Sequence, residues 1–184
     1  MRLRIVLACV TLAIMLAPTG APAETAVNVS KNGSVFSIEA VSTVAAPLET
    51  AWEVLADYES YPAFVPNLTV SRRIGDDPLR VEQRGDFRVL FFRREVHVQL
   101  QIDEQPPLRI LFRAFAGNLK SLFTEVSLEP HDIGTLIRYK STIEPDFWVP
   151  PLITSTILRF EFRGKLEAVA DEIMRRTAGA KAAP

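Results

Sequence analysis

Residues 135–177 decide the fold, and they read TLIRYKSTIEPDFWVPPLITSTILRFEFRGKLEAVADEIMRRT. Over residues 135–144 apolar side chains alternate with polar or charged ones, which is the pattern of a strand with one buried face. After Pro150-Pro151 the apolar residues recur every three or four positions, which predicts a helix over residues 151–177 with a broad apolar face. The stretch therefore joins a half-buried strand to a long amphipathic helix.

The chain before residue 135 repeats the strand pattern, with short turns rich in proline, glycine and aspartate between the strands. Short connections favour an antiparallel meander, because parallel pairs need long crossovers. Helical spacing predicts a first short helix over Pro47–Asp57 and a second after Tyr61, with Pro62 at its start and Pro66 at its end. The further predicted strands are 34–44, 68–74, 79–92, 96–103, 108–113 and 122–129.

A sheet and a helix that each have one apolar face must pack together, and a twisted antiparallel sheet curls around such a helix. We therefore expect the α+β class, with a curved antiparallel sheet wrapped around a long C-terminal helix and two short helices after the first strand. The interior is either a fully packed core or a cavity where the curved sheet and the straight helix do not touch. The residues predicted to line such a cavity are Phe64, Val81, Gln83, Phe87, Val98, Leu100, Ile110, Phe112, Thr124, Val126, Ile137, Tyr139, Ser141, Ile153, Ile157 and Phe160.

Two pairs of segments carry a resemblance to a known family: VAAPLETAWEVLADY (44–58) with YPAFVP (61–66), and GTLIRY (134–139) with PDFWVPP (145–151). They are similar to the START-like superfamily of polyketide cyclases and lipid-transfer proteins. Within it, the branch of coenzyme-Q-binding START domains and ribosome-association toxins is the most similar. The resemblance implies a helix-grip fold with a pocket for a hydrophobic small molecule such as a lipid, a quinone or a polyketide-like compound. It names no particular ligand.

The N-terminus has the order of segments of a secretory signal. Arg2 and Arg4 precede an apolar run, and Ala21-Pro22-Ala23 offers a peptidase site, so we expect a cleaved signal over residues 1–23 and an exported, periplasmic protein. An uncut membrane anchor is the alternative. Loss of the two arginines would change the net charge from −1 to −3, which does not favour nucleic acid as a partner. The remaining chain is expected to divide into a loose lead-in (24–33), the ligand-binding domain (34–177) and a disordered tail (178–184).

The sequence shows no constellation of catalytic residues, and we predict no cofactor and no metal. His97 and His131 stand at unrelated positions, and both are expected on the surface. Arg159 and Glu161 could reach the pocket, but solvation or ion pairing is the favoured interpretation. The Tyr139 hydroxyl could contact a ligand carbonyl or could lie at the rim of a packed core.

Three functions remain open from these residues. The first is a non-covalent carrier of a hydrophobic small molecule, the second a cyclase or dehydratase, and the third a protein-interaction module without a ligand. Apolar residues beside arginines at a pocket mouth are typical of transient contact with an anionic membrane. The residues predicted to make that contact are Phe91, Phe92, Arg93, Arg94 and Trp148.

Overall fold

The computed structural model describes residues 24–89 and 91–182, so the predicted signal over residues 1–23 lies outside the described part. The strands are β1 (Glu24–Asn32), β2 (Val35–Val44), β3 (Leu68–Asp76), β4 (Leu79–Val89), β5 (Phe92–Gln105), β6 (Arg109–Gly117), β7 (Leu119–His131) and β8 (Gly134–Pro145). The helices are α1 (Leu48–Ala56), the 3-10 helix η1 (Tyr58–Ala63) and α2 (Ser155–Ala182). Among these helices, none is long and apolar enough to cross a membrane.

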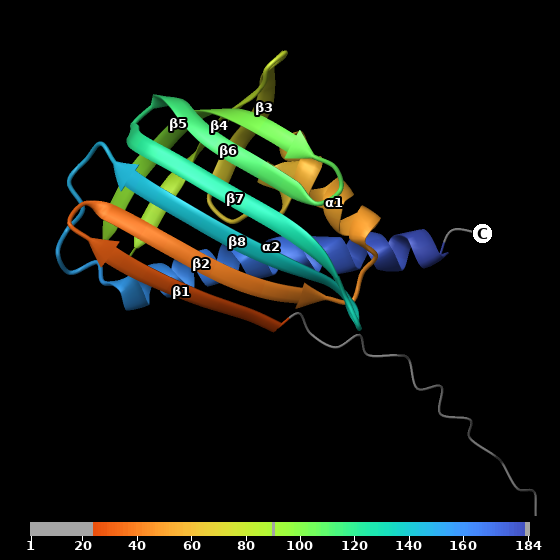
Figure 1. The fold of residues 1–184 in the computed structure, drawn as a ribbon. Helices are drawn as coiled ribbons and strands as arrows, with labels where there is room; N and C mark the ends of the chain where they lie inside the picture. Colours follow the sequence, from red (N-terminus) through yellow and green to blue (C-terminus); the bar gives the residue numbers. More distant parts are fainter. Residues whose placement is uncertain (1–23, 90, 183–184) are drawn as a thin grey trace, which may run out of the picture.

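The strands form one eight-stranded antiparallel sheet in the order β1-β2-β8-β7-β6-β5-β4-β3. Strands β3 to β8 follow one another as a meander, and β2 then pairs with β8. The sheet curves around α2, which runs along its concave side (Figure 1). At one end of the sheet α1 contacts α2. Strands β1 and β2, at one edge of the sheet, also contact α2, and β4, near the other edge, contacts it from the opposite side. The predicted α+β helix-grip architecture is therefore confirmed.

Three predicted boundaries were wrong. The lead-in over residues 24–33 is not loose, because Glu24–Asn32 pairs with β2 along its whole length as edge strand β1. The helix does not start at residue 151 but at Ser155, and it continues through Ala182, so the expected disordered tail over residues 178–184 is helical as far as it is described. Local signals were present in both segments, because the two-residue turn Gly33-Ser34 joins β1 directly to β2 and alanine favours the helical end of α2.

The concave face of the sheet holds the core that the alternation predicted. Val98, Leu100 and Ile102 of β5 are buried, while Gln101 and Asp103 between or beside them are exposed. The buried residues divide into two clusters along the axis of α2. The larger one gathers around α1, η1 and the C-terminal half of α2, and the smaller one around Phe36, Ile38, Ile153 and Leu158.

Candidate ligand cavity

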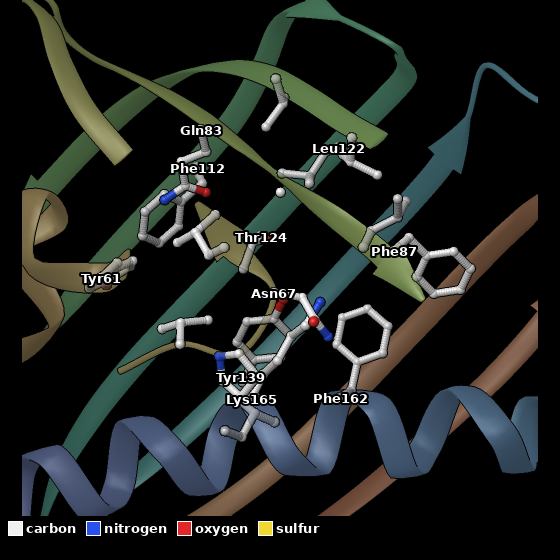
Figure 2. Close-up of a pocket in the computed structure, with 18 of the residues that line it drawn as sticks. Tyr61, Asn67, Gln83, Phe87, Phe112, Leu122, Thr124, Tyr139, Phe162 and Lys165 are labelled. Carbon is white, nitrogen blue, oxygen red and sulfur yellow. The ribbon is translucent and has the colours of Figure 1, made fainter. Parts of the chain in front are cut away.

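A cavity of about 360 Å³ lies between the concave face of the sheet and α2, between the two buried clusters. This volume falls within the roughly 300–1,000 Å³ that is typical of small-molecule sites. In Figure 2, Phe112, Leu122 and Thr124 point into it from the sheet, and Phe162 and Lys165 reach it from α2. The loop from Val65 to Leu68, between η1 and β3, closes part of the side between β4 and α2. The interior is therefore an open space with an apolar lining.

Nine of the sixteen residues predicted to line the cavity do so. The structure brings together the predicted strand positions Gln83, Phe87, Val98, Leu100, Phe112, Thr124, Val126, Ile137 and Tyr139. Their shared property is that they point to the concave face from β4 to β8, which is the face that strand alternation assigned to them.

Seven predicted lining residues lie elsewhere. Val81 and Ile110 are fully buried in the larger cluster, and Phe64 packs against it. Ser141 is buried behind Thr124, to which it is hydrogen-bonded. Ile153 and Ile157 belong to the smaller cluster, and Phe160 is exposed. These positions have the right polarity, but they pack against protein atoms or face solvent.

The error on α2 concerns which side of the helix faces the sheet. The sequence carries two apolar stripes, and the prediction placed the stripe of Ile153, Ile157 and Phe160 over the cavity. In the structure the other stripe faces it, including Leu158, Phe162, Leu166 and Val169. The length of this second stripe was visible in the sequence and was the signal that could have found these residues.

Sequence reasoning also missed the residues at the two ends of the cavity and around its mouth. Leu55 and Tyr61 line one end, and Phe36, Phe147 and Val149 line the other. These residues come from a helix, a 3-10 turn, the first long strand and the segment before α2. Segments so far apart in the sequence give no local indication that they meet.

Two polar side chains of the cavity lining bond to serines that do not line it. The hydroxyls of Thr124 and Ser141 are 2.7 Å apart, and Gln83 Nε2 donates to Ser71 Oγ at 3.3 Å. Burial raises the pKa of Tyr139 above its usual range, although the nearby hydroxyls of Ser141 and Thr124 oppose the rise. Tyr139 therefore stays neutral at physiological pH and can donate a hydrogen bond, but it is no ready base.

Neither histidine lies in the cavity lining. His131, the last residue of β7, is exposed, as predicted. His97 lies on the outer face of β5, as predicted, where it is half-buried and its Nε2 lies 3.0 Å from Glu82 Oε1. Within residues 24–89 and 91–182, no group of His, Cys, Asp and Glu side chains is arranged to hold a metal ion.

Glu82 is the buried charge of the sheet, and it lies on the face opposite the cavity. Its side chain is 4% exposed and accepts from Arg72 Nε at 2.6 Å and Arg84 at 2.7 Å, in addition to the contact with His97. These partners outweigh the cost of burial, with Arg84 the strongest, and lower the pKa of Glu82 to about 2. The carboxylate thus ties β3, β4 and β5 together.

Acid should therefore destabilise the fold in a defined range. The pKa of Glu82 is depressed in the folded state, so its contribution is complete above about pH 4.5 and is lost as the pH falls towards about 2. Glu172, held by Arg175 and Arg176 on α2, has a pKa lowered to about 2 and acts over the same range. Urea unfolding between pH 2 and 7 should show that Glu82→Gln and Glu172→Gln each cost stability at neutral pH. Each variant's deficit should shrink towards pH 2, and a deficit that did not change with pH would contradict the assignment.

The mouth of the cavity lies between the Val65–Leu68 loop, β4 and α2. Asn67 Nδ2 donates across it to Glu161 Oε1 at 3.5 Å, and the same oxygen lies 3.3 Å from Lys165 Nζ. Glu161 is therefore ion-paired at the rim, in agreement with the favoured interpretation of the sequence. Arg159 is exposed and is not among the lining residues.

Two of the predicted contact aromatics are strongly exposed near one end of the cavity. Phe91, in the β4–β5 turn, is 81% exposed, and Trp148, in the segment before α2, is 71% exposed. Phe92 was wrongly predicted to be exposed. It is half-buried and packs edge-on against Phe87, with ring centroids 6.1 Å apart.

The two predicted arginines differ in their surroundings. Arg93 Nη2 donates to Asp86 at 2.9 Å and shares that carboxylate with Arg88. Arg94 lies over the ring of Phe147, 5.4 Å from the centroid, which places the β4–β5 hairpin beside the segment before α2. The Phe91 turn and Trp148 therefore belong to the same end of the molecule (Figure 1).

The sheet, the long helix and the apolar cavity between them define a helix-grip protein with an internal binding space. The chain belongs to the polyketide cyclase/dehydrase and lipid-transport family, whose model matches residues 44–179. The START-like resemblance noted in the sequence is thereby confirmed. Members of this family bind hydrophobic ligands or act as polyketide cyclases and dehydrases, and no curated protein matches the chain.

Solved structures share the fold at low sequence identity. The chain is 13% identical to a STAR-related lipid transfer protein (fragment 25–204) from Xanthomonas axonopodis, with a TM-score of 0.63, covering 85% of this chain and 96% of that one. It is 18% identical to the Zhui aromatase/cyclase from Streptomyces sp. R1128, with a TM-score of 0.58 and coverage of 77% and 95%. A START superfamily protein from Mycobacterium smegmatis is 19% identical, with a TM-score of 0.55 and coverage of 80% and 99%. At these identities the likeness shows the fold alone.

Proposed function

We propose that this protein is an exported, non-covalent carrier of a hydrophobic small molecule, a lipid or a quinone. The observation that carries the proposal is the cavity of about 360 Å³ with its apolar lining. Such a space binds by shape and by removing apolar surface from water, at roughly 25 cal/mol per Å². Export rests on the predicted signal over residues 1–23.

The polar groups favour carriage over chemistry. A catalyst needs a positioned acid, base or nucleophile next to the reacting atoms. The Thr124 hydroxyl in the lining bonds to buried Ser141, and the Asp86 carboxylate is held by Arg88 and Arg93. Tyr139 is the cavity group best placed to donate a hydrogen bond to a substrate, because its ring lines the space and its raised pKa keeps the hydroxyl protonated.

A cyclase or dehydratase acting on a polyketide-like substrate is therefore the second candidate. A substitution at Tyr139 distinguishes this enzyme from the carrier. Tyr139→Phe removes the hydroxyl and keeps the ring. Turnover of an aromatic polyketide that is lost in this variant, while binding is kept, would favour the enzyme. Binding without turnover in both proteins supports the carrier.

Mass spectrometry on an organic extract of the native protein, purified from the cell envelope, tests the carrier directly. A stoichiometric lipid or quinone is expected, together with an N-terminus at Glu24 after cleavage behind Ala23. A protein found intact from Met1 in the cytosol would contradict export. If the extract contained no ligand and the protein purified in a stable complex with another protein, an interaction module would be favoured.

A carrier of a water-insoluble ligand must collect it at a surface, and the exposed aromatics suit transient contact with an anionic membrane. Each buried aromatic side chain contributes up to about 1.5–3 kcal/mol, and a nearby arginine such as Arg94 adds about 1 kcal/mol. Phe91→Glu combined with Trp148→Glu should slow the uptake of a fluorescent lipid from phosphatidylglycerol vesicles at least tenfold. Affinity for the same lipid presented in detergent should stay unchanged.

Leu108→Glu is the matched control for that experiment. Leu108 is 51% exposed in the turn at the other end of β5, far from Phe91. Its replacement adds the same charge as either single replacement, Phe91→Glu or Trp148→Glu, and should leave uptake unchanged. If the control slowed uptake as much as the double variant, net charge and not these aromatics would set the rate.

A further inference from the structure

Among the α2 residues that line the cavity, Lys165 is charged and the others are apolar. The lining part of α2 runs from Leu158 to Ala170, and Lys165 lies within it, beside Phe162 and Leu166. The Lys165 side chain is 30% exposed, so it reaches both the cavity and the mouth. A charge placed at the boundary of an apolar space is where the polar head of an amphipathic ligand would rest, with the tail inside.

Lys165 keeps donor capacity for such a head. An ammonium group has three N–H donors, and Glu161 Oε1, at 3.3 Å, takes at most one of them. That contact also fixes the ammonium at the rim. The other charged residues of the lining, Arg84 and Asp86, are already engaged in ion pairs. Arg84 donates twice to Glu82, and Asp86 accepts from Arg88 and Arg93.

Asn67 offers a second donor at the same place. Its backbone is held in the left-handed region, with φ of 62°, and its carbonyl accepts from the Asp86 amide at 2.8 Å. Gly85 allows this close approach, because a Cβ there would lie 2.3 Å from the Asn67 oxygen. The amide side chain is thereby aimed across the mouth at Glu161, and one of its two N–H groups remains for a ligand (Figure 2).

The space itself is long. From Leu158 to Ala170 the cavity follows thirteen residues of α2, whose twelve steps of 1.5 Å span about 18 Å. An apolar space that follows the helix over this length is able to hold an extended chain. Its ends are closed by aromatic side chains such as Tyr61 and Phe147.

We propose that the ligand is a linear amphipath with an anionic head, a carboxylate or phosphate, bound by Lys165 Nζ and Asn67 Nδ2. This inference rests on the proposed carrier function and specifies its ligand. The tail lies along α2 against the sheet, and the head stays at the mouth in partial contact with water. Glu161 holds Lys165 in place but opposes the anion through its own charge.

The test uses dodecanoate, 1-dodecanol and dodecylamine with the purified protein at pH 8, measured by displacement of a neutral apolar dye. The expected order of affinity is dodecanoate first, at least tenfold above the alcohol, with the amine last. Lys165→Gln should remove the preference for dodecanoate over the alcohol, and Lys165→Arg should keep most of it. Lys140→Gln, on an exposed outer position of β8, is the control and should change nothing.

Glu161→Gln makes the test decisive, because it breaks the same ion pair from the other side. A head-group site predicts that Glu161→Gln raises the affinity for dodecanoate while Lys165→Gln lowers it. An ion pair with only a structural role predicts that both variants act in the same direction, and that result would overturn the inference.

The two proposals fail separately. Equal affinity of the wild type for dodecanoate and dodecanol would refute the anionic head and leave the carrier intact. If no dodecyl compound displaced the dye and the dye bound outside the cavity, the carrier function would fail as well.

Discussion

Replacing Leu122 with tryptophan should reduce the affinity for a hydrophobic ligand at least a hundredfold and leave the fold intact. Leu122 lines the cavity from β7 and is only partly buried, so the indole has empty space to enter (Figure 2). In a filled core the same overpacking would cost about 1–3 kcal/mol. For a chain of this length that corresponds to a fall in Tm of roughly 2–12 °C. Here the ligand-free Tm should change by less than about 2 °C.

The measurement compares ligand-free proteins, because a bound ligand stabilises the fold by itself. Leu111→Trp is the matched control, since Leu111 is half-buried on β6 with its side chain on the outer face of the sheet. It should retain full binding. A strongly destabilised Leu122→Trp protein would mean that the space is closed in solution, which would contradict the cavity and the carrier together.

The largest effect on stability is expected at Gly134, which begins β8. Its φ is +146°, and a Cβ at this position would lie 2.2 Å from the Val44 oxygen and 2.7 Å from the Ala46 nitrogen. The next residue, the fully buried Thr135, donates from Oγ1 to the Ala46 oxygen at 2.8 Å and so holds the corner between β2 and α1. Gly134→Ala must displace that corner, at a cost of at least about 3 kcal/mol.

Gly164→Ala is the control with the opposite sign. Gly164 lies inside α2, and a Cβ there would meet nothing within 4 Å. Alanine favours the helix over glycine by roughly 1 kcal/mol, so the variant should be more stable than the wild type. Chemical denaturation of both variants decides the matter. A Gly134→Ala protein within about 1 kcal/mol of wild type would show that the corner can relax.

Local patterns predicted the strands of the meander well. Alternation over residues 96–103 and 122–129 assigned Val98, Leu100, Thr124 and Val126 to the concave face, where the structure places them. Side chains on a strand have a period of two, so each strand leaves only two choices of face, and apolar character chooses between them. The prediction failed for residues 24–32, because pairing with β2 and not composition makes them a strand.

For α2, the apolar pattern predicts a helix but does not define which side of it faces the sheet. Residues 153–173 carry apolar side chains on more than half of the helix surface, so several rotations of α2 would bury a comparable apolar area. Pairing of β2 with β8 and contact of α1 with α2 fix one of these rotations, in which Leu158 and Phe162 face the cavity and Phe160 faces solvent. Those contacts join residues at least 91 positions apart.

The sequence by itself determined most of the elements, the faces of the meander strands and the helix-grip class, because these follow from periodicity and from short connections within neighbouring segments. Tertiary structure alone decided that the interior contains a space, which side of α2 borders it, and that Asn67, Glu161 and Lys165 meet at its mouth. The physical reason is that a cavity is a region where side chains fail to meet. Its volume depends on the curvature of the whole sheet against a straight helix, and no single segment encodes that curvature.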